Sequence, residues 1–468
     1  MAIPPNKSFD RSLVEGPILS SVWKLAWPTM LQNVIAGLQG IIDHMLVGHL
    51  LGFTANAAIG VSWQIFLVVV VFISSLYSGM GAMVARFAGA GDTEKVNRVV
   101  YQAFLTSILL ALGVFAPLGY FFSPHLLELV HAAPEVQAEA LPFLRTMFVF
   151  SLGMLIFFLL GGALRAAGDA RTPLQLGVLM TVLNIILNVI LIRGFGPIPA
   201  LGTLGSALGT VIASGVVAAI GMYLLFSSRT VIHFPKGMSW KPDWEIIRSL
   251  FRFGLPAGFQ GIAMNIAGVL LLRYIGALPQ SAEAQAAFAV GYTELFSLIT
   301  WTSVGLMGAT AALAGQNLGA GKPERSKRAV HTASMIGLGV AVTIGLLFQI
   351  IPQSLLALFG MEDGVVVDIG VQLLRYLSIS GLFITSALVY TGGLQGTGDT
   401  RSPLYISLIS QIAIPLGYCA VKQAQGGLQP ADIWLAIVMG HAARCLLSMW
   451  KFRQGKWQEI KMEVAARA

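Results

Sequence analysis

Twelve long apolar stretches limit most strongly what this chain can fold into. Each has about 20 residues or more, the length that an α-helix needs to cross a bilayer. Of all residues, 56% are hydrophobic and only 11% are charged, against about 25% charged residues in a typical soluble domain. The expected spans are 20–48, 57–86, 98–122, 141–165, 173–194, 203–226, 250–276, 285–316, 329–351, 370–395, 403–421 and 431–452. We therefore predict an all-α integral membrane protein with about twelve transmembrane helices.

The net charge of +8 would fit a nucleic-acid-binding protein, but the positions of the basic residues indicate membrane topology instead. With twelve spans both termini lie on one side, where tails and loops carry 23 Lys and Arg, whereas the opposite side carries five. An excess of Lys and Arg in short loops marks the cytoplasmic side. We expect a multi-pass protein of the inner (plasma) membrane, surrounded by lipid, with both termini in the cytoplasm and no nucleic-acid partner.

The chain contains two copies of one unit. GALRAAGDARTPL (162–174) recurs as GGLQGTGDTRSPL (392–404), with seven identities at an offset of 230, and the same offset relates AGAGDTEKVNR (88–98) to LGAGKPERSKR (318–328). Since 230 residues hold six spans, both copies enter the membrane in the same direction, as in parallel-repeat transporters. The predicted parts are a cytoplasmic N-terminal segment (1–19), an N-lobe (20–226), a cytoplasmic linker (227–249), a C-lobe (250–452) and a cytoplasmic tail (453–468).

Each duplicated loop contains a Gly-Asp-x-Arg-x-Pro element that has a structural explanation. A glycine after a helix adopts positive φ without strain, an aspartate caps the next helix or pairs with the arginine, and a proline fits the first helical turn. We therefore interpret both elements as structural motifs. Their residues are Gly168, Asp169, Arg171 and Pro173 in the first copy, and Gly398, Asp399, Arg401 and Pro403 in the second.

The sequence lacks the signatures of enzymes and metal sites. GQNLGAGKPE resembles a phosphate-binding loop, but its spacing is wrong and Pro323 replaces the Ser or Thr after the lysine. The seven histidines form no HExxH pair, and the two cysteines, Cys419 and Cys445, lie within apolar stretches. We expect no enzymatic activity, no catalytic residue, no metal site and no cofactor apart from a coupling ion.

Polar and ionisable side chains within the spans are candidates for function, because a bilayer makes them costly. Of the 21 acidic residues, only Asp43 and Glu294 fall well inside predicted spans. The first span also contains Gln32 and Pro28, and a proline inside a helix removes a backbone hydrogen bond. We expect this helix to face a cavity and to bend near Pro28, and Pro256 is the matching proline of the second copy.

Two asparagines of the fifth span, Asn184 and Asn188, are four residues apart and therefore share one helix face. If they face the bundle interior, their amides could complete a hydrogen-bond or cation shell around a carboxylate. An interhelical hydrogen bond that only joins helices explains them equally well. The two interpretations stay open at this point.

The sequence resembles the multidrug and toxic compound extrusion (MATE) family over nearly its whole length. The resemblance lies in IIDHMLVGHLLG of the first span, in the AGAGD and GQNLGAGK loops, and in both Gly-Asp-x-Arg-x-Pro loops. It implies that the two halves form lobes around a central cleft. It also implies a small-molecule exporter of organic cations or amphiphilic drugs that works by alternating access with H⁺ or Na⁺ antiport. The aspartate of the family's first helix matches Asp43, and the polar pair of its fifth helix matches Asn184 and Asn188.

The sequence is closer to the DinF-like branch of that family than to the NorM-like branch, because helices 7 and 10 lack the acidic residues that the NorM-like branch uses. The expected cation-coupling and substrate cavity contains Asp43, Asn184, Asn188, Gln32 and Glu294. One carboxylate and two amides supply little negative charge for Na⁺, so H⁺ is the expected coupling ion. Since burial disfavours a charged carboxyl group, Asp43 is expected to take up a proton outside and release it inside.

A flippase for a lipid-linked or polysaccharide precursor is the alternative within the same superfamily. Such a protein would be expected to line its cleft with several Arg or Lys for phosphate. Apart from Arg444, near the inner end of the twelfth span, no basic residue lies deep in a predicted span. We therefore favour drug export, by a protein that is expected to be monomeric.

Overall fold

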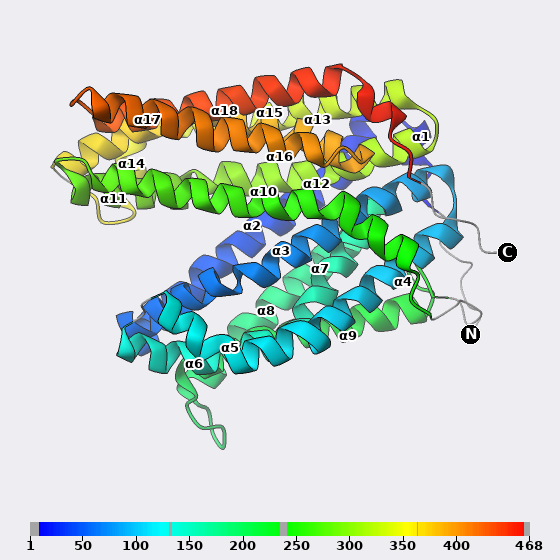
Figure 1. Cartoon of the computed structure of the whole chain (residues 1–468), viewed down its shortest axis with the longest axis horizontal. Coiled ribbons are helices and arrows are strands. Elements are labelled where there is room, and N and C mark those ends of the chain that lie inside the picture. The colour runs from blue at the N-terminus through cyan, green and yellow to red at the C-terminus, as the bar shows by residue number, and fades with distance from the viewer. Residues whose placement is uncertain (1–8, 131–132, 235–240, 363, 463–468) are drawn as a thin grey trace. The chain divides into compact units, whose positions relative to one another are not determined.

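The computed structural model describes residues 9–130, 133–234, 241–362 and 364–462 (Figure 1). Within them the regular structure is helical, apart from one β-bridge between Phe195 and Ile198. In the described residues, eleven helices are long and apolar enough to cross a membrane, and the number rises to twelve if one bent pair of helices is counted as a single span. These helices confirm the predicted fold class. Residues 1–8, 235–240 and 463–468, which belong to the predicted N-terminal segment, linker and tail, lie outside the described residues.

Most spans are single helices, and three contain a π-helical segment, a feature that is often found at functional sites. The single helices are α2 (Ile18–Leu51), α3 (Phe53–Ala90), α8 (Arg171–Arg193), α9 (Gly202–Phe226), α10 (Trp244–Gly276), α13 (Pro323–Ile350), α15 (Val365–Thr397) and α18 (Pro430–Arg453). The π-containing spans are α4 (Thr93–Leu110), η1 (Ala111–Phe115) and α5 (Ala116–Leu129); α11 (Ser281–Phe288), η2 (Ala289–Leu295) and α12 (Ser297–Gly319); and α16 (Arg401–Ser407), η3 (Leu408–Ala413) and α17 (Ile414–Ala424). Short helices are α1 (Ser12–Glu15), α14 (Pro352–Ala357) and η4 (Lys456–Glu459).

The fourth expected span, 141–165, consists of two helices. α6 (Pro134–Val149) and α7 (Ser151–Ala166) meet at Phe150 with a bend of 53°. A Cβ atom on Gly153 would lie 2.9 Å from the Cα of Gly215, so α7 packs on α9 at a distance that only glycine permits. Pro142 lies inside α6 without ending it. The break therefore coincides with close packing of α7 against α9 and not with a proline.

The helices form two compact units. Unit 1 is built on Ile35–Gly258, and unit 2 is built on Arg11–Val34 and Phe259–Met462. The division runs through α2 and α10, so the first part of each of these helices belongs to the unit formed mainly by the other repeat. The predicted lobes, 20–226 and 250–452, differ from these units by the exchange of these two helix segments.

The two units repeat the same helix packing. In unit 1, α3 packs on α4 and α7, and α7 packs on α9. In unit 2, α12 packs on α13 and α15, and α15 packs on α18. These helices correspond at the offset of 230 residues that relates the duplicated loops. The duplication in the sequence is therefore also a duplication in three dimensions.

Small residues allow the exchanged helix segments to pack closely. In unit 1, a Cβ atom on Gly254 of α10 would lie 1.9 Å from the carbonyl oxygen of Ser75 in α3. In unit 2, a Cβ atom on Gly305 of α12 would lie 2.6 Å from the Cα of Met30 in α2. Ser75 and Gly305 are equivalent at the offset of 230. Both contacts bring backbone against backbone, so any larger side chain would push the helices apart.

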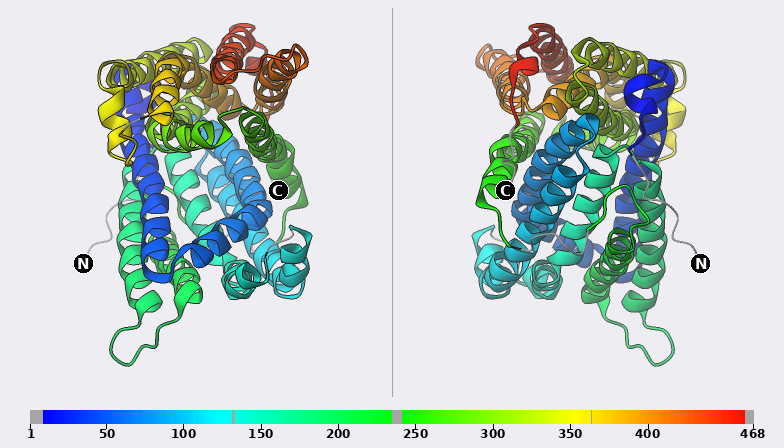
Figure 2. Two further views of the ribbon diagram at one scale, coloured as in Figure 1. Left: turned by 90° about the vertical axis from the view of Figure 1, so that its left-hand side faces the viewer. Right: turned by 90° about the vertical axis from the view of Figure 1, so that its right-hand side faces the viewer.

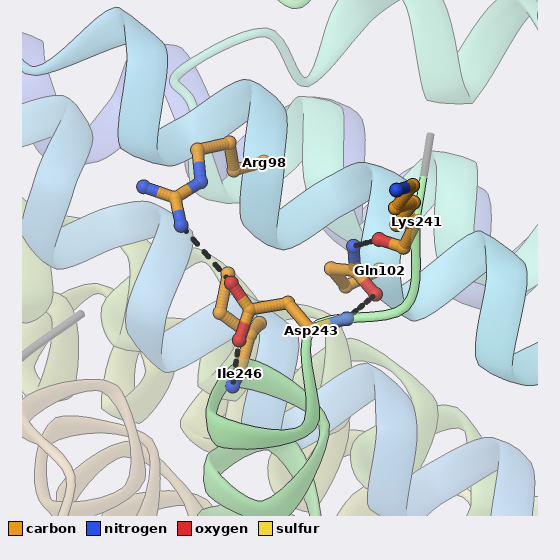
Figure 3. Close-up of polar contacts among 5 residues, drawn as sticks. All are labelled: Arg98, Gln102, Lys241, Asp243 and Ile246. Carbon is orange, nitrogen blue, oxygen red and sulfur yellow. Dashed lines mark hydrogen bonds and ion pairs between the residues drawn. The ribbon is translucent and has the colours of Figure 1, made fainter. Parts of the chain in front are cut away.

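The segment that leads into α10 is fixed to α4 within unit 1 (Figure 3). Arg98 Nη2 lies 3.0 Å from Asp243 Oδ2. The side chain of Gln102 donates to the Lys241 carbonyl at 2.9 Å and accepts from the Asp243 N–H at 3.0 Å. Asp243 Oδ1 also accepts from the Ile246 N–H in the first turn of α10. As a result α10 begins at Trp244, inside the range 227–249 that the sequence assigned to the linker.

α8 and α9 form an antiparallel pair, joined by a hairpin that extends past the ends of both helices (Figure 2). Phe195 and Ile198 exchange backbone hydrogen bonds of 3.0 and 3.1 Å in this hairpin. The short connection keeps the two helices in register. Their facing residues include the polar side chains of the candidate site.

Candidate functional site

A cluster of polar side chains lies between α2, α8 and α9 in unit 1. Asn184 and Asn188 of α8 are fully buried, whereas Asp43 of α2 is half-buried. Asn188 Nδ2 donates to Asp43 Oδ1 at 2.9 Å. The interhelical contact that the spacing of the two asparagines allowed is therefore made to the carboxyl group of Asp43.

Gln39 and Thr181 extend the cluster along α2 and α8. Thr181 Oγ1 donates to Gln39 Oε1 at 2.7 Å. Gln39, one helical turn before Asp43, is also hydrogen-bonded to the Asp43 carboxyl group. The carboxyl group of Asp43 thus has amide partners from both its own helix and α8.

The amide oxygen and nitrogen of Asn184 are told apart only by their hydrogen-bond partners, so its carboxamide can be placed in two orientations. In the first, Nδ2 donates to Thr210 Oγ1 at 3.1 Å and Oδ1 accepts from Asn188 Nδ2 at 3.3 Å. In the second, turned by 180°, Nδ2 donates to both Asp43 oxygens at 2.9 and 3.3 Å, and Oδ1 accepts from the Thr210 hydroxyl at 3.1 Å, but Nδ2 also lies 3.0 Å from Gln39 Nε2. Which orientation fits therefore depends on whether the groups that face Asn184 donate or accept.

Gly209 of α9 makes room for Asn188. A Cβ atom at position 209 would lie 2.0 Å from Asn188 Oδ1. That oxygen is buried and accepts no hydrogen bond from any described residue. The side of the cluster next to α9 therefore presents an acceptor, and its position depends on a glycine in the neighbouring helix.

The other predicted cavity residues, Gln32 and Glu294, belong to unit 2. Glu294 lies in η2 and is half-buried, and its carboxylate pairs with no side chain among the described residues. Pro28 and Pro256 lie inside α2 and α10, and both helices continue through them. Bending at these prolines stays a prediction.

The duplicated loops have the geometry of helix connections. Gly168 and Gly398 both have φ of 102°, a conformation that favours glycine. Asp169 accepts hydrogen bonds from the N–H groups of Arg171 and Thr172 and from the Thr172 hydroxyl, whereas Asp399 accepts from the N–H and hydroxyl of Ser402.

Both aspartates therefore cap the next helix, and in the described chain neither forms an ion pair with the arginine two residues later. Arg171 and Arg401 are exposed. Pro173 and Pro403 each occupy the third residue of the helix that follows.

Thr181 and Thr210 were missed by the sequence analysis. Thr181 precedes Asn184 by three residues, so helical spacing could have placed it on the same face. Thr210 lies in a different helix that is rich in small residues. Only the pairing of α8 with α9 shows that it contacts Asn184.

The comparisons with known proteins agree with this architecture. The MatE family model matches residues 28–190 and 256–419, one match in each repeat and together more than half of the chain. The chain belongs to the MatE family. This MatE protein is therefore a multi-pass membrane transporter and not an enzyme, as the resemblance predicted. The assignment to the DinF-like branch stays a prediction.

Several relatives match the MatE protein over nearly their full length. The probable multidrug resistance protein NorM of Thermotoga maritima is 29% identical, with 93% of this chain and 92% of the relative covered. The probable multidrug resistance protein YoeA of Bacillus subtilis is 25% identical over 94% of this chain and 95% of the relative. A structure described as the outward-facing conformation of a multidrug resistance MATE family transporter has a TM-score of 0.88 at 21% identity, covers 97% of this chain and 100% of its own, and supports the fold.

Proposed function

We propose that this MatE protein is a secondary active exporter of organic cations or amphiphilic drugs, driven by H⁺ antiport, in the inner (plasma) membrane with both termini in the cytoplasm. The names of its relatives support drugs as substrates, and the 23 basic residues on one side of the spans support this topology. The observation that carries the coupling mechanism is the contact of Asp43 with the side chains of Asn184 and Asn188, because the orientation of the Asn184 amide that fits depends on whether Asp43 is protonated.

The first orientation of Asn184 fits a protonated Asp43. In it, Asn184 Oδ1 lies 2.9 Å from Asp43 Oδ1. Two oxygens at this separation need a hydrogen between them, and only a protonated carboxyl group supplies one. The Asn184 amide then donates to Thr210, and the Thr210 hydroxyl donates to the Ser206 carbonyl at 3.2 Å.

The second orientation fits an ionised Asp43. The carboxylate is then an acceptor only and receives hydrogen bonds from the amides of both Asn184 and Asn188. The Thr210 hydroxyl turns to donate to Asn184. Loss of one proton at α2 thus reverses the hydrogen bonds as far as α9.

This reversal of hydrogen bonds changes the difference in free energy between the outward-facing and inward-facing states of the transporter. A cationic drug is attracted to ionised Asp43, and protonation removes that attraction. Proton and drug would therefore bind in turn to the same part of unit 1. A two-state transporter is coupled when its ligands bind its states with different affinity.

Sodium is the weaker candidate for the coupling ion. Cation sites in proteins are built from several oxygen ligands with substantial negative charge. Asp43 is the one acidic member of the cluster, and most of its neighbours contribute neutral amides or hydroxyls. The proton requires no such shell.

The proposal is tested by reconstituting the protein in liposomes and following efflux of rhodamine B ethyl ester, a fluorescent cation. A pH gradient alone should drive efflux, and a sodium gradient at equal pH should not. Efflux that responds only to the sodium gradient would overturn proton coupling. Failure of both gradients, combined with movement of a lipid-linked precursor, would favour the flippase alternative.

A further inference from the structure

Unit 2 contains a buried arginine that the coupling mechanism does not use. Arg444 lies in α18, nine residues before its end, which corresponds to about 13 Å along the helix axis. Its side chain is only 3% exposed. The depth and burial exclude extension of the guanidinium to the membrane surface.

The guanidinium of Arg444 forms no hydrogen bond or ion pair with any described residue, and its buried Nε has no partner there. Tyr292 of η2 and His441 of α18 lie near Arg444 in the same unit, since the ring of Tyr292 is 5.4 Å from that of Phe296, and Phe296 stacks on His441, three residues before Arg444, at 6.0 Å. The ring of Tyr292 stacks on Phe288 with centroids 4.8 Å apart and an angle of 8°, which fixes its position. The Tyr292 hydroxyl likewise forms no hydrogen bond in the described part of the chain.

One further donor lies nearby on α18. Ser448 follows Arg444 by four residues, so it lies on the same face of α18. Its hydroxyl is buried without a hydrogen-bond partner among the described residues. α15 covers this face: Ser380 and His441 are 2.5 Å apart, and the rings of Tyr390 and Phe452 are 5.6 Å apart. This interior thus offers neutral hydrogen-bond donors and one full positive charge.

A buried charge without a partner is unfavourable by several kcal/mol or more. An arginine remains charged at any ordinary pH, so it cannot avoid this cost by losing its proton. Its planar guanidinium binds a carboxylate with two parallel hydrogen bonds. A negatively charged group of small size is therefore the partner that this site lacks.

We propose that Arg444, together with the Tyr292 hydroxyl, binds a monovalent anionic group inside unit 2, either a free halide or the carboxylate of a zwitterionic substrate. One guanidinium balances one negative charge, which favours a monoanion over a phosphate dianion. Ser448 adds a neutral donor on the same face of α18. Binding of a substrate carboxylate depends on the proposed transport of drugs, whereas binding of a free halide does not.

The test uses two binding measurements on purified protein in detergent, without any gradient. In the first, chloride replaces isethionate at constant ionic strength and the thermal unfolding midpoint is followed, since a bound ligand stabilises the folded state. In the second, fluorescence anisotropy compares rhodamine B, which carries a carboxylate, with its ethyl ester, which does not. Both are repeated with Arg444→Gln and with Arg375→Gln, an exposed arginine of α15 that serves as the matched control.

A chloride-dependent rise in the midpoint that is lost only in Arg444→Gln identifies a free anion as the ligand. A preference for rhodamine B over its ester of about tenfold, the scale of one hydrogen bond to a charged group, that is lost only in Arg444→Gln identifies a substrate carboxylate. Tyr292→Phe keeps the ring stack and should weaken either effect several-fold, so it tests the site if Arg444→Gln does not fold. The proposal is overturned if the wild-type protein shows neither effect, or if both effects persist in Arg444→Gln.

Discussion

The polar cluster around Asp43 in unit 1 and the one around Arg444 in unit 2 have opposite character, although the two units share one helix packing. In unit 1, Asp43 and the free oxygen of Asn188 are acceptors. In unit 2, Arg444 and Ser448 are donors without partners among the described residues. Duplication has therefore preserved the scaffold while the chemistry inside each copy has diverged.

Equivalent positions show how the divergence arose. At the offset of 230, Arg444 corresponds to Ser214 of α9, a buried serine whose hydroxyl donates to the Val211 carbonyl at 3.1 Å. Asn184 and Asn188 correspond to Ile414 and Tyr418, so the second copy has no equivalent of the amide pair. The second copy thus has a charged residue where the first has serine, and it lacks the amides that contact the carboxyl group in the first.

The largest effect is expected from Asp43→Asn. Asparagine keeps the shape and part of the hydrogen bonding but cannot gain or lose a proton, so gradient-driven efflux should fall to the background of empty liposomes while the protein stays folded. Glu294→Gln is the matched change in unit 2 and should retain efflux. Proton-driven efflux that is undiminished in well-folded Asp43→Asn would refute the mechanism and make Glu294 the next carboxylate to test.

Gly209→Ala should disturb the same site without changing any titratable group. The new methyl group would overlap Asn188 Oδ1, and overpacking of this kind costs about 1–3 kcal/mol. We expect a lower thermal midpoint and a several-fold slower proton-driven efflux. Gly215→Ala, on the same helix, is the control because its Cβ would meet no atom within 4 Å. Equal behaviour of the two variants would show that the position of Asn188 does not matter for transport.

Asn188→Asp should increase the chemical difference between the two clusters, because it adds a second carboxyl group to the cluster around Asp43. A second carboxyl group 2.9 Å from Asp43 would make the two titrate as a coupled pair, because like charges so close together favour sharing of a proton. The pH optimum of efflux should therefore move upward, with transport retained. An unchanged pH profile of efflux, measured over the same range as for the wild type, would show that residue 188 does not influence proton binding.

The sequence predicted the parts of the fold that depend on periodicity and repetition. Long apolar runs identified the spans, and the two Gly-Asp-x-Arg-x-Pro loops identified the duplication. The bend at Phe150 was not predictable, since it occurs away from the proline of its span and where α7 packs closely on α9. The exchange of the first parts of α2 and α10 between the units also depends on contacts between residues that are far apart in the sequence.

The candidate site was predictable in part, for similar reasons. Asp43 was identified by the cost of an acidic group in the membrane, and the asparagines by their spacing on one helix face. Thr210 lies on another helix, and nothing in its local sequence pairs it with Asn184. Arg444 was visible as a basic residue deep in a span, but the lack of an acidic partner near it requires the packing of α15, α18 and η2 to be known.

The smallest effects are expected from changes to the helix caps. These changes compare equivalent positions of the two copies that lie outside the polar clusters. Asp169→Ala and Asp399→Ala should each lower stability by about 1 kcal/mol, the usual contribution of an N-cap. Asp169 accepts three hydrogen bonds and Asp399 accepts two, so the loss should be larger for the first copy. Thermal unfolding in detergent measures the difference, and relative efflux rates for several drugs should stay unchanged in both variants. A selective loss of one drug would mean that these loops take part in recognition and are not only structural.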